Sequence, residues 1–236
     1  MFNPAARITR LAIPGLDDCV YVVDELLAEP QRWVELAAQH LDGFALTGHN
    51  AYPGPELRMP DGIAEALDGW LRAQLREAFG VRRTLRVYAR LAMVTLPPEQ
   101  LAPRQWICHR DRMGMAPDER ALASVLYLFA DEHLGGTSFY RPLKPMEQIE
   151  ALIEDSARLS ATEFAARHDW TPGYPGASNA SFERVLTVPP RYNRAIFYDG
   201  SLFHCSDIPE PARLSVDPQR GRLTLNGFWV CRRAAR

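Results

Sequence analysis

The chain has 236 residues and a formal net charge of −2, from 27 basic and 29 acidic side chains. Hydrophobic residues make up 47% of it, which is enough for one globular domain with a sizeable core. The balanced charge disfavours a nucleic-acid or membrane-surface partner, and neither a signal-like N-terminus nor an apolar run of about eighteen residues is present, so we expect a cytoplasmic protein with neither partner.

The first part of the chain, residues 1–82, is predicted to form an α/β support for the rest of the domain. Cys19–Val23 is a short apolar run typical of a strand. Two helices are predicted from apolar residues at helical spacing: Trp33, Leu36, Ala37 and Leu41, then Ile63, Leu67, Trp70, Leu71 and Leu75. Asp61 can cap the second helix and Gly80 can end it. His49–Pro60 is rich in Pro and Gly and predicts a loop.

Residues 83–236 are predicted to form a β-rich core with an insertion at about 141–191. Within that insertion Pro145–His168 is expected to be helical, and Thr171–Ser181 is expected to be a loop. Short strands are expected over Leu85–Leu91, Arg104–His109, Ser124–Phe129, Thr137–Tyr140, Val185–Val188, Ala195–Tyr198 and Arg222–Val230. Many short strands in one domain, here 1–236, favour a barrel or jelly roll with a ligand site between two sheets.

A candidate metal site begins at the end of the strand expected over Arg104–His109. His109 and Asp111 are two residues apart, and such residues project to the same side of a strand. His204, which follows the strand Ala195–Tyr198 and a turn, offers a third ligand. Two histidines and one carboxylate on one face of a metal, with the other face open, suit non-haem Fe(II). The open positions are where a cosubstrate and O2 would bind.

An oxygenase that uses an oxo acid also needs a cation for the acid's far carboxylate, and the planar fork of arginine serves best. Arg222 opens an alternating strand and shares a face with Thr224, so both can reach a polar cavity. Tyr127 can add its hydroxyl. Arg213 lies nine residues after His204 and is the alternative, but its proline-flanked position predicts a loop, so we prefer Arg222.

The order of these motifs resembles the Fe(II)- and 2-oxoglutarate-dependent dioxygenases, especially their prolyl-4-hydroxylase-like branch. The resemblance is carried, in chain order, by Tyr21–Leu27 with Pro30, His109-x-Asp111, the Val-Leu-Tyr-Leu strand at 125–128, Gly135–Tyr140, His204, and Arg222-x-Thr224. The segment 141–191 carries no motif of this family. The resemblance therefore covers most of the chain.

The resemblance implies a mainly β fold with helices, a double-stranded β-helix of the jelly-roll or cupin-like type. It implies Fe(II) held by His109, Asp111 and His204, and 2-oxoglutarate held by Arg222, Thr224 and Tyr127. Reaction with O2 would release succinate and CO2 and oxidise a C–H bond of a small molecule, an amino acid or a peptidyl side chain. Asp111 stands where halogenases of the family have a small residue, which favours hydroxylation, desaturation or demethylation over halogenation.

Other functions stay open at this point, as do the substrate and the oligomeric state. One is a catalytically silent β-barrel module that binds a small acid, and another is a cupin-like metalloenzyme that does not use 2-oxoglutarate. His109-Arg110-Asp111 is also a kinase tripeptide, but no Asp-Phe-Gly follows and no Gly-rich loop precedes it.

Two further features have competing interpretations. Cys108 and Cys205 adjoin two proposed ligands and raise the idea of a soft-metal site, but strand alternation points them away, so buried reduced thiols are expected. The insertion is either a solvated helical surface or a lid over the metal.

Overall fold

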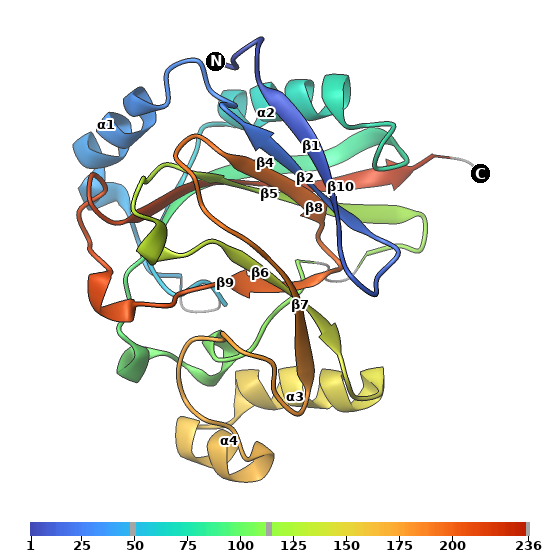
Figure 1. The fold of residues 1–236 in the computed structure, drawn as a ribbon, viewed down its shortest axis with the longest axis vertical. Helices are drawn as coiled ribbons and strands as arrows, with labels where there is room; N and C mark the ends of the chain where they lie inside the picture. Colours follow the sequence, from blue (N-terminus) through green and yellow to red (C-terminus); the bar gives the residue numbers. More distant parts are fainter. Residues whose placement is uncertain (48–50, 112–114, 235–236) are drawn as a thin grey trace.

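The computed structural model describes residues 1–47, 51–111 and 115–234, and their strands form two antiparallel sheets (Figure 1). The larger sheet has the order β1-β2-β8-β5-β10-β4-β3, and the smaller one has the order β7-β6-β9. The strands are β1 (Arg7–Ala12), β2 (Cys19–Asp24), β3 (Glu56–Arg58), β4 (Val81–Val94), β5 (Glu119–Tyr127), β6 (Thr137–Pro142), β7 (Phe182–Val188), β8 (Ala195–Asp199), β9 (Phe203–Ser206) and β10 (Arg222–Arg233).

Two helices cover the outer face of the larger sheet, and two more lie beyond the smaller sheet (Figure 1). They are α1 (Gln31–Gln39), α2 (Asp61–Gln74), α3 (Met146–Arg158) and α4 (Ala161–His168). Short 3-10 helices occupy Leu41–Gly43, Pro98–Gln100, Pro103–Gln105, Glu132–Leu134 and Pro211–Arg213. In the described part of the chain, no helix has the length and apolar character needed to cross a membrane.

The alternation along β10 separates the helix-covered core from the space between the sheets. Leu223 and Leu225 pack with the residues of α2 in the outer core cluster. On the other face, Arg222 and Thr224 line a pocket between the sheets. The two pairs face opposite ways because neighbouring residues of a strand project to opposite faces of the sheet. The pocket that Arg222 and Thr224 line therefore lies between the two sheets, where the sequence analysis expected a ligand site.

The insertion packs as a structural unit against the smaller sheet. Ile149 of α3 and Phe164 of α4 are buried in one cluster with Trp106 and Phe203. Asp155 of α3 accepts hydrogen bonds from side chains of α4 and so joins the two helices. The helical content predicted for Pro145–His168 is confirmed.

The fold class predicted from the sequence, a mainly β jelly roll with supporting helices, is confirmed, but several local predictions are wrong. Asp61 does not cap α2: Pro60 is the preceding residue, and no side chain caps that end. The helix ends at Gln74, before a turn that closes at Gly80 with φ +59°. Part of the predicted loop His49–Pro60 is strand β3; His49 itself lies outside the described residues.

The largest error concerns Arg104–His109, which does not form a strand. Pro103 begins a 3-10 turn, and the Gln105 side chain closes it by accepting a hydrogen bond from the backbone N–H of Ala102 (2.9 Å). The proline presets the backbone angle for such a turn and removes a donor that a strand needs. His204 likewise lies on a separate short strand, β9, which the sequence analysis did not predict.

Candidate metal centre and cosubstrate pocket

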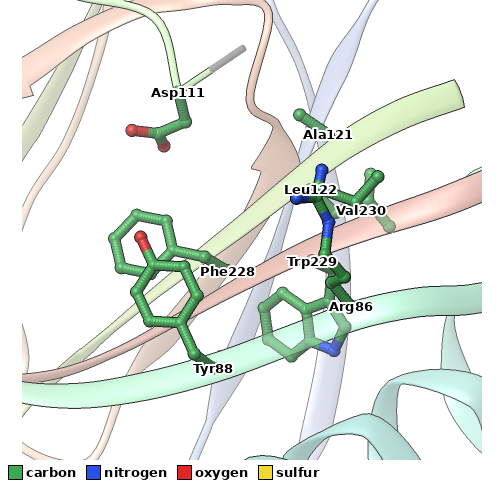
Figure 2. A pocket seen from close by; sticks show the side chains of 8 residues that line it. All are labelled: Arg86, Tyr88, Asp111, Ala121, Leu122, Phe228, Trp229 and Val230. Carbon is green, nitrogen blue, oxygen red and sulfur yellow. The ribbon is translucent and has the colours of Figure 1, made fainter. Parts of the chain in front are cut away.

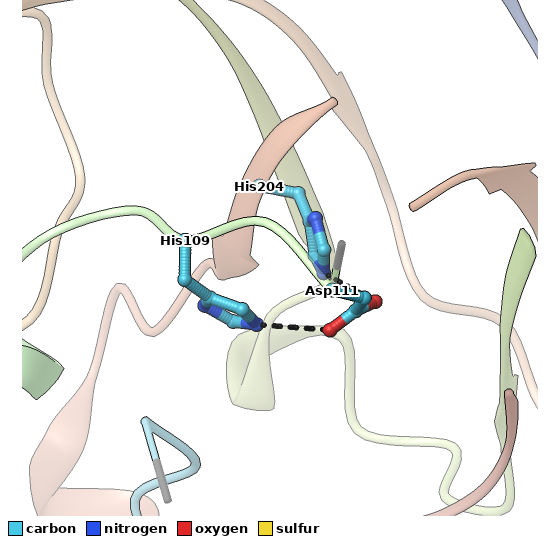
Figure 3. A group of neighbouring side chains, drawn as sticks. All are labelled: His109, Asp111 and His204. Atoms are coloured by element: carbon cyan, nitrogen blue, oxygen red, sulfur yellow. Dashed lines mark ion pairs between the residues drawn. The ribbon is translucent and has the colours of Figure 1, made fainter. Parts of the chain in front are cut away.

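His109, Asp111 and His204 converge between the sheets (Figure 3). Nε2 of His109 lies 3.7 Å from Oδ1 of Asp111, and Nε2 of His204 lies 3.4 Å from Oδ2. One ligand atom from each residue lies within 4.8 Å of the others, so the group could hold a metal ion. The backbones of the two histidines pair through two reciprocal hydrogen bonds of 2.9 Å, and this bridge brings the motifs together.

The surrounding backbone orients each ligand. The Nδ1–H of His204 donates to the carbonyl of Leu202 (2.9 Å), which leaves Nε2 with its lone pair directed at the group. The backbone N–H of Asp111 donates to the carbonyl of Gly200 (2.7 Å). A Cβ on Gly200 would lie 3.1 Å from the Cβ of Asp111 and 3.0 Å from the Cβ of Ala121. The absence of a side chain at Gly200 therefore lets the Asp111 segment approach the sheet.

The electrostatics of the three residues favour binding of a cation. Burial lowers the pKa of His109 well below its usual value, and electrostatic interactions with His204 and Arg90 lower it further. Burial raises the pKa of Asp111, and the electrostatic interactions with His204 and Arg90 oppose this rise. Oδ2 of Asp111 is buried and accepts no hydrogen bond from the described residues. A buried carboxylate oxygen without a donor, beside two imidazoles, fits a divalent metal ion.

Arg222 lies in the same pocket and is only 1% exposed. Its Nε donates to the carbonyl of Gly135 (3.0 Å), and its Nη2 donates to that of Gly136 (2.6 Å). A Cβ on Gly136 would lie 1.9 Å from the carbonyl oxygen of Val188, so only glycine fits there. The Gly135-Gly136 pair thus holds the guanidinium in place, while its Nη1 makes no hydrogen bond to the described residues.

The other predicted cosubstrate residues occupy different positions. Thr224 lines the pocket, and its hydroxyl donates to the carbonyl of Ala92 (3.3 Å). Tyr127 is fully buried and shares a 2.8 Å hydrogen bond with Thr137, a residue of the pocket wall. Burial raises the pKa of Tyr127 to about 12, so it stays protonated. Arg213 lies at the surface, paired with Glu210.

Several residues that the sequence analysis did not assign to the site also line the pocket, among them Arg90 and Tyr52. Arg90 is paired with Glu56 (2.6 Å), and its guanidinium carbon lies 4.6 Å from the ring centroid of Phe228. The hydroxyls of Tyr52 and Thr224 are 3.5 Å apart. The alternation of side chains along β4 could have placed Arg90 on the pocket face from the sequence alone. Tyr52 lies in the predicted loop, where no such alternation indicates the direction of a side chain.

The pocket is nearly filled by its own side chains. Its free volume is about 40 Å³, which is room for a few water molecules. The Gln105 side chain fixes the Tyr52 segment by donating a hydrogen bond to the backbone carbonyl of Tyr52 (3.1 Å). A smaller adjoining space is lined by Gln105, Ile107 and His109, so these three residues do face one cavity. A five-carbon oxo acid is larger than this free volume, so its binding requires side chains of the pocket wall to move.

Cys108 and Cys205, which adjoin His109 and His204 in the sequence, are buried thiols in the hydrophobic cluster that also contains Ile149 and Phe164. Burial raises the pKa of Cys205 to about 12 and also raises that of Cys108 well above its usual value. A thiol must lose its proton to bind a metal, so this burial opposes the soft-metal interpretation. The helices of the insertion line neither the metal pocket nor the space beside Ile107; in that space the loop after α4 contributes Tyr174 and Pro175.

Comparison with solved structures finds similar folds among enzymes. The 2-oxoglutarate-dependent epimerase SnoN of nogalamycin biosynthesis matches with a TM-score of 0.50 and 13% identity, over 92% of this chain and 80% of that one. HygX from Streptomyces hygroscopicus, solved with nickel and 2-oxoglutarate, has a TM-score of 0.49 and 9% identity, over 90% of this chain and 82% of that one. A Pseudomonas putida prolyl-4-hydroxylase has a TM-score of 0.43 and 18% identity, over 91% of this chain and 93% of that one. The match to SnoN shows that the chain shares the fold of a 2-oxoglutarate-dependent non-haem enzyme.

A family model matches residues 4–229. The chain belongs to DUF6445, a family of unknown function. No curated protein matches the sequence. The structure of this DUF6445 member thus has a group able to hold a metal, and the chemistry of that site is the basis for inferring a reaction.

Proposed function

We propose that this chain is an Fe(II)- and 2-oxoglutarate-dependent oxygenase that hydroxylates, or oxidises in a related way, a small molecule, an amino acid or a peptidyl side chain. The observation that carries the proposal is the joint placement of two sets of groups. His109, Asp111 and His204 form the metal group, and Arg222 lies buried in the same pocket. A degenerate binding module would have no need to keep both sets.

Each residue has a distinct role in this proposal. His109, Asp111 and His204 hold Fe(II) on one face. Arg222 binds the distal carboxylate of 2-oxoglutarate through its free Nη1, with Thr224 beside it and Tyr127 supporting the pocket wall. When bound, the iron and the oxo acid supply the oxidative chemistry that consumes O2 and yields succinate and CO2. The protein positions the reactants and excludes water from them.

Arg90 adds a positive charge near the metal group. Its Nε is buried and has no hydrogen-bond partner in the described chain. Glu56 compensates the charge of Arg90, but an acceptor oxygen of a ligand in the pocket would satisfy this N–H, since a buried donor is costly without a partner. Arg90 therefore favours a ligand that carries acceptor oxygens, such as an oxo acid.

The test is an anaerobic titration of the purified protein with Fe(II) and 2-oxoglutarate, monitored by the weak visible charge-transfer band of the chelated oxo acid. We expect the band in the wild type and its loss in His109→Ala. A succinate assay under air follows. Metal binding without a band would instead support a cupin-like enzyme that does not use 2-oxoglutarate, and no metal binding would support a silent binding module; either result overturns the proposal.

A further inference from the structure

A second and larger cavity, of about 280 Å³, lies next to the metal group (Figure 2). Its walls come from β4, β5 and β10 and from the Asp111 segment; the lining residues are Arg86, Tyr88, Asp111, Ala121, Leu122, Phe228, Trp229 and Val230. Asp111 and Phe228 line this cavity and the cosubstrate pocket alike. A molecule bound here would therefore lie beside the proposed metal ligand.

The cavity is mostly apolar and has one flat wall. Tyr88 and Phe228 stand opposite each other in the register of β4 and β10, and their rings stack at 4.8 Å with an interplanar angle of 16°. Tyr88 is nevertheless 44% exposed, so this stack borders an open space. Figure 2 shows the two rings below Asp111, on the opposite side of the cavity from Ala121. Such a wall suits a planar apolar group.

Arg86 supplies the cavity's positive charge. It is exposed, and it makes no hydrogen bond or ion pair with any residue that the structure describes. By contrast, the neighbouring arginines are occupied: Arg90 is paired with Glu56, and Arg120 with Asp199. In Figure 2 the side chain of Arg86 reaches from β4 toward Ala121, across the cavity from the two rings. Arg86 is thus available for an anionic ligand.

Arg86 and Arg222, the arginine of the proposed cosubstrate pocket, lie far apart along β10. Arg86 pairs with Val230, whereas Arg222 is eight residues away at the start of the same strand. At about 3.3 Å per residue, the two positions are about 26 Å apart along β10. One small anion cannot bind both arginines. The two cations therefore serve different ligands, with Asp111 between them.

We propose that this cavity is the substrate site and that the substrate is a small carboxylate with a flat apolar body. Arg86 binds the carboxylate, and Tyr88 and Phe228 pack against the body. The volume is close to the lower limit for small-molecule sites, about 300 Å³, which restricts the ligand to a small molecule or one inserted side chain. The inference rests on the proposed function only in taking the molecule bound here to be the one that is oxidised.

The experiment measures binding of two matched probes, phenylacetate and phenylacetamide, to the full-length protein by ligand-observed NMR. The measurement is made without 2-oxoglutarate and is then repeated under anaerobic conditions with an excess of it, which by the proposed function occupies the Arg222 pocket. We expect the carboxylate to bind more tightly than the amide, and Arg86→Gln to weaken its binding by about tenfold. Arg82→Gln is the matched control, because Arg82 is an exposed arginine of the same strand that does not line the cavity. This control should bind like the wild type.

Equal binding of acid and amide, or equal losses in the two arginine variants, would overturn the proposal. The test separates it from the proposed function because carboxylate binding at Arg86 requires no turnover. If Arg86-dependent binding is found while Fe(II) and 2-oxoglutarate give no charge-transfer band, the carboxylate site stands and the oxygenase proposal fails. If the band forms but neither probe depends on Arg86, the oxygenase proposal stands and the substrate class is wrong.

Discussion

Arg222 and Arg213 offer a direct comparison at the scale of single residues. Arg222 is buried and holds two backbone carbonyls, whereas Arg213 is exposed and paired with Glu210. We predict that Arg222→Gln raises the 2-oxoglutarate concentration for half-saturation by about tenfold or more, because a charge-assisted hydrogen bond is lost. The measurement is the anaerobic visible titration at fixed Fe(II).

Arg213→Gln is the control, and we expect its titration to match the wild type. Because Arg222→Gln also leaves the carbonyls of Gly135 and Gly136 short of donors, it should lower the free energy of unfolding by about 1–3 kcal/mol. Urea unfolding separates this loss from the binding defect. A steep effect of Arg213→Gln with none from Arg222→Gln would show that the assignment of the cosubstrate arginine is wrong.

Gly200 is a second single position on which the site depends. Gly200→Ala would place a Cβ 3.1 Å from that of Asp111 and 3.0 Å from that of Ala121, so one of these neighbours must move. We predict weaker Fe(II) binding by about tenfold, since small displacements of a ligand are costly in a preorganised site. Anaerobic equilibrium dialysis measures the change. The double variant Gly200→Ala/Ala121→Gly should recover part of the Fe(II) affinity. No recovery, with unchanged folding, would contradict the steric explanation.

At the scale of elements, the sequence predicts regular strands well and the site's connections poorly. The alternation of β10 correctly placed Arg222 and Thr224 opposite the core, because period-two direction is a local property. The prediction of a strand leading to His109 was wrong because a turn that begins at Pro103 takes its place. The pairing of His109 with His204 is a contact between distant segments, and no local pattern encodes it. The same applies to Tyr52, whose approach to Thr224 depends on the folded loop.

One ion pair joins two elements and gives a pH-dependent prediction. Asp24 at the end of β2 accepts hydrogen bonds from Arg194, just before β8, at 2.7 and 3.1 Å. These bonds, with the charges of Arg194 and Arg191, hold the pKa of Asp24 below its usual value despite partial burial. A lowered folded-state pKa stabilises the fold above the unfolded value of about 3.9, and this contribution is lost as the pH falls through the folded value.

We therefore predict that Asp24→Asn reduces the free energy of unfolding by about 1 kcal/mol at pH 6–8. The difference from the wild type should shrink on acidification below about pH 4 and vanish once Asp24 is protonated in both states. Urea unfolding across this pH range measures it. A difference that stays constant down to the lowest pH would show that the side chain's shape, and not its charge, is responsible.

At the scale of the whole molecule, the metal group connects the two sheets. His204 lies on β9 of the smaller sheet, and Asp111 is anchored to Gly200, directly after β8 of the larger one. Binding of a metal ion would thus join both layers of the jelly roll. A ligand that binds the folded state alone stabilises it by mass action, by about 2.7 kcal/mol at one hundred times its Kd.

The last prediction follows from this geometry. Anaerobic Fe(II) at about one hundred times its Kd should raise the Tm of the wild type by about 5–10 °C, since about 2–4 °C per kcal/mol is typical of this chain length. His204→Ala should show no rise, judged with and without metal in the same variant because His204 is buried. His133→Ala, an exposed histidine paired with Glu210, should respond like the wild type. A chelator should reverse the rise. An equal rise in His204→Ala would place the stabilising metal elsewhere and separate the jelly roll's stability from the His109–Asp111–His204 group.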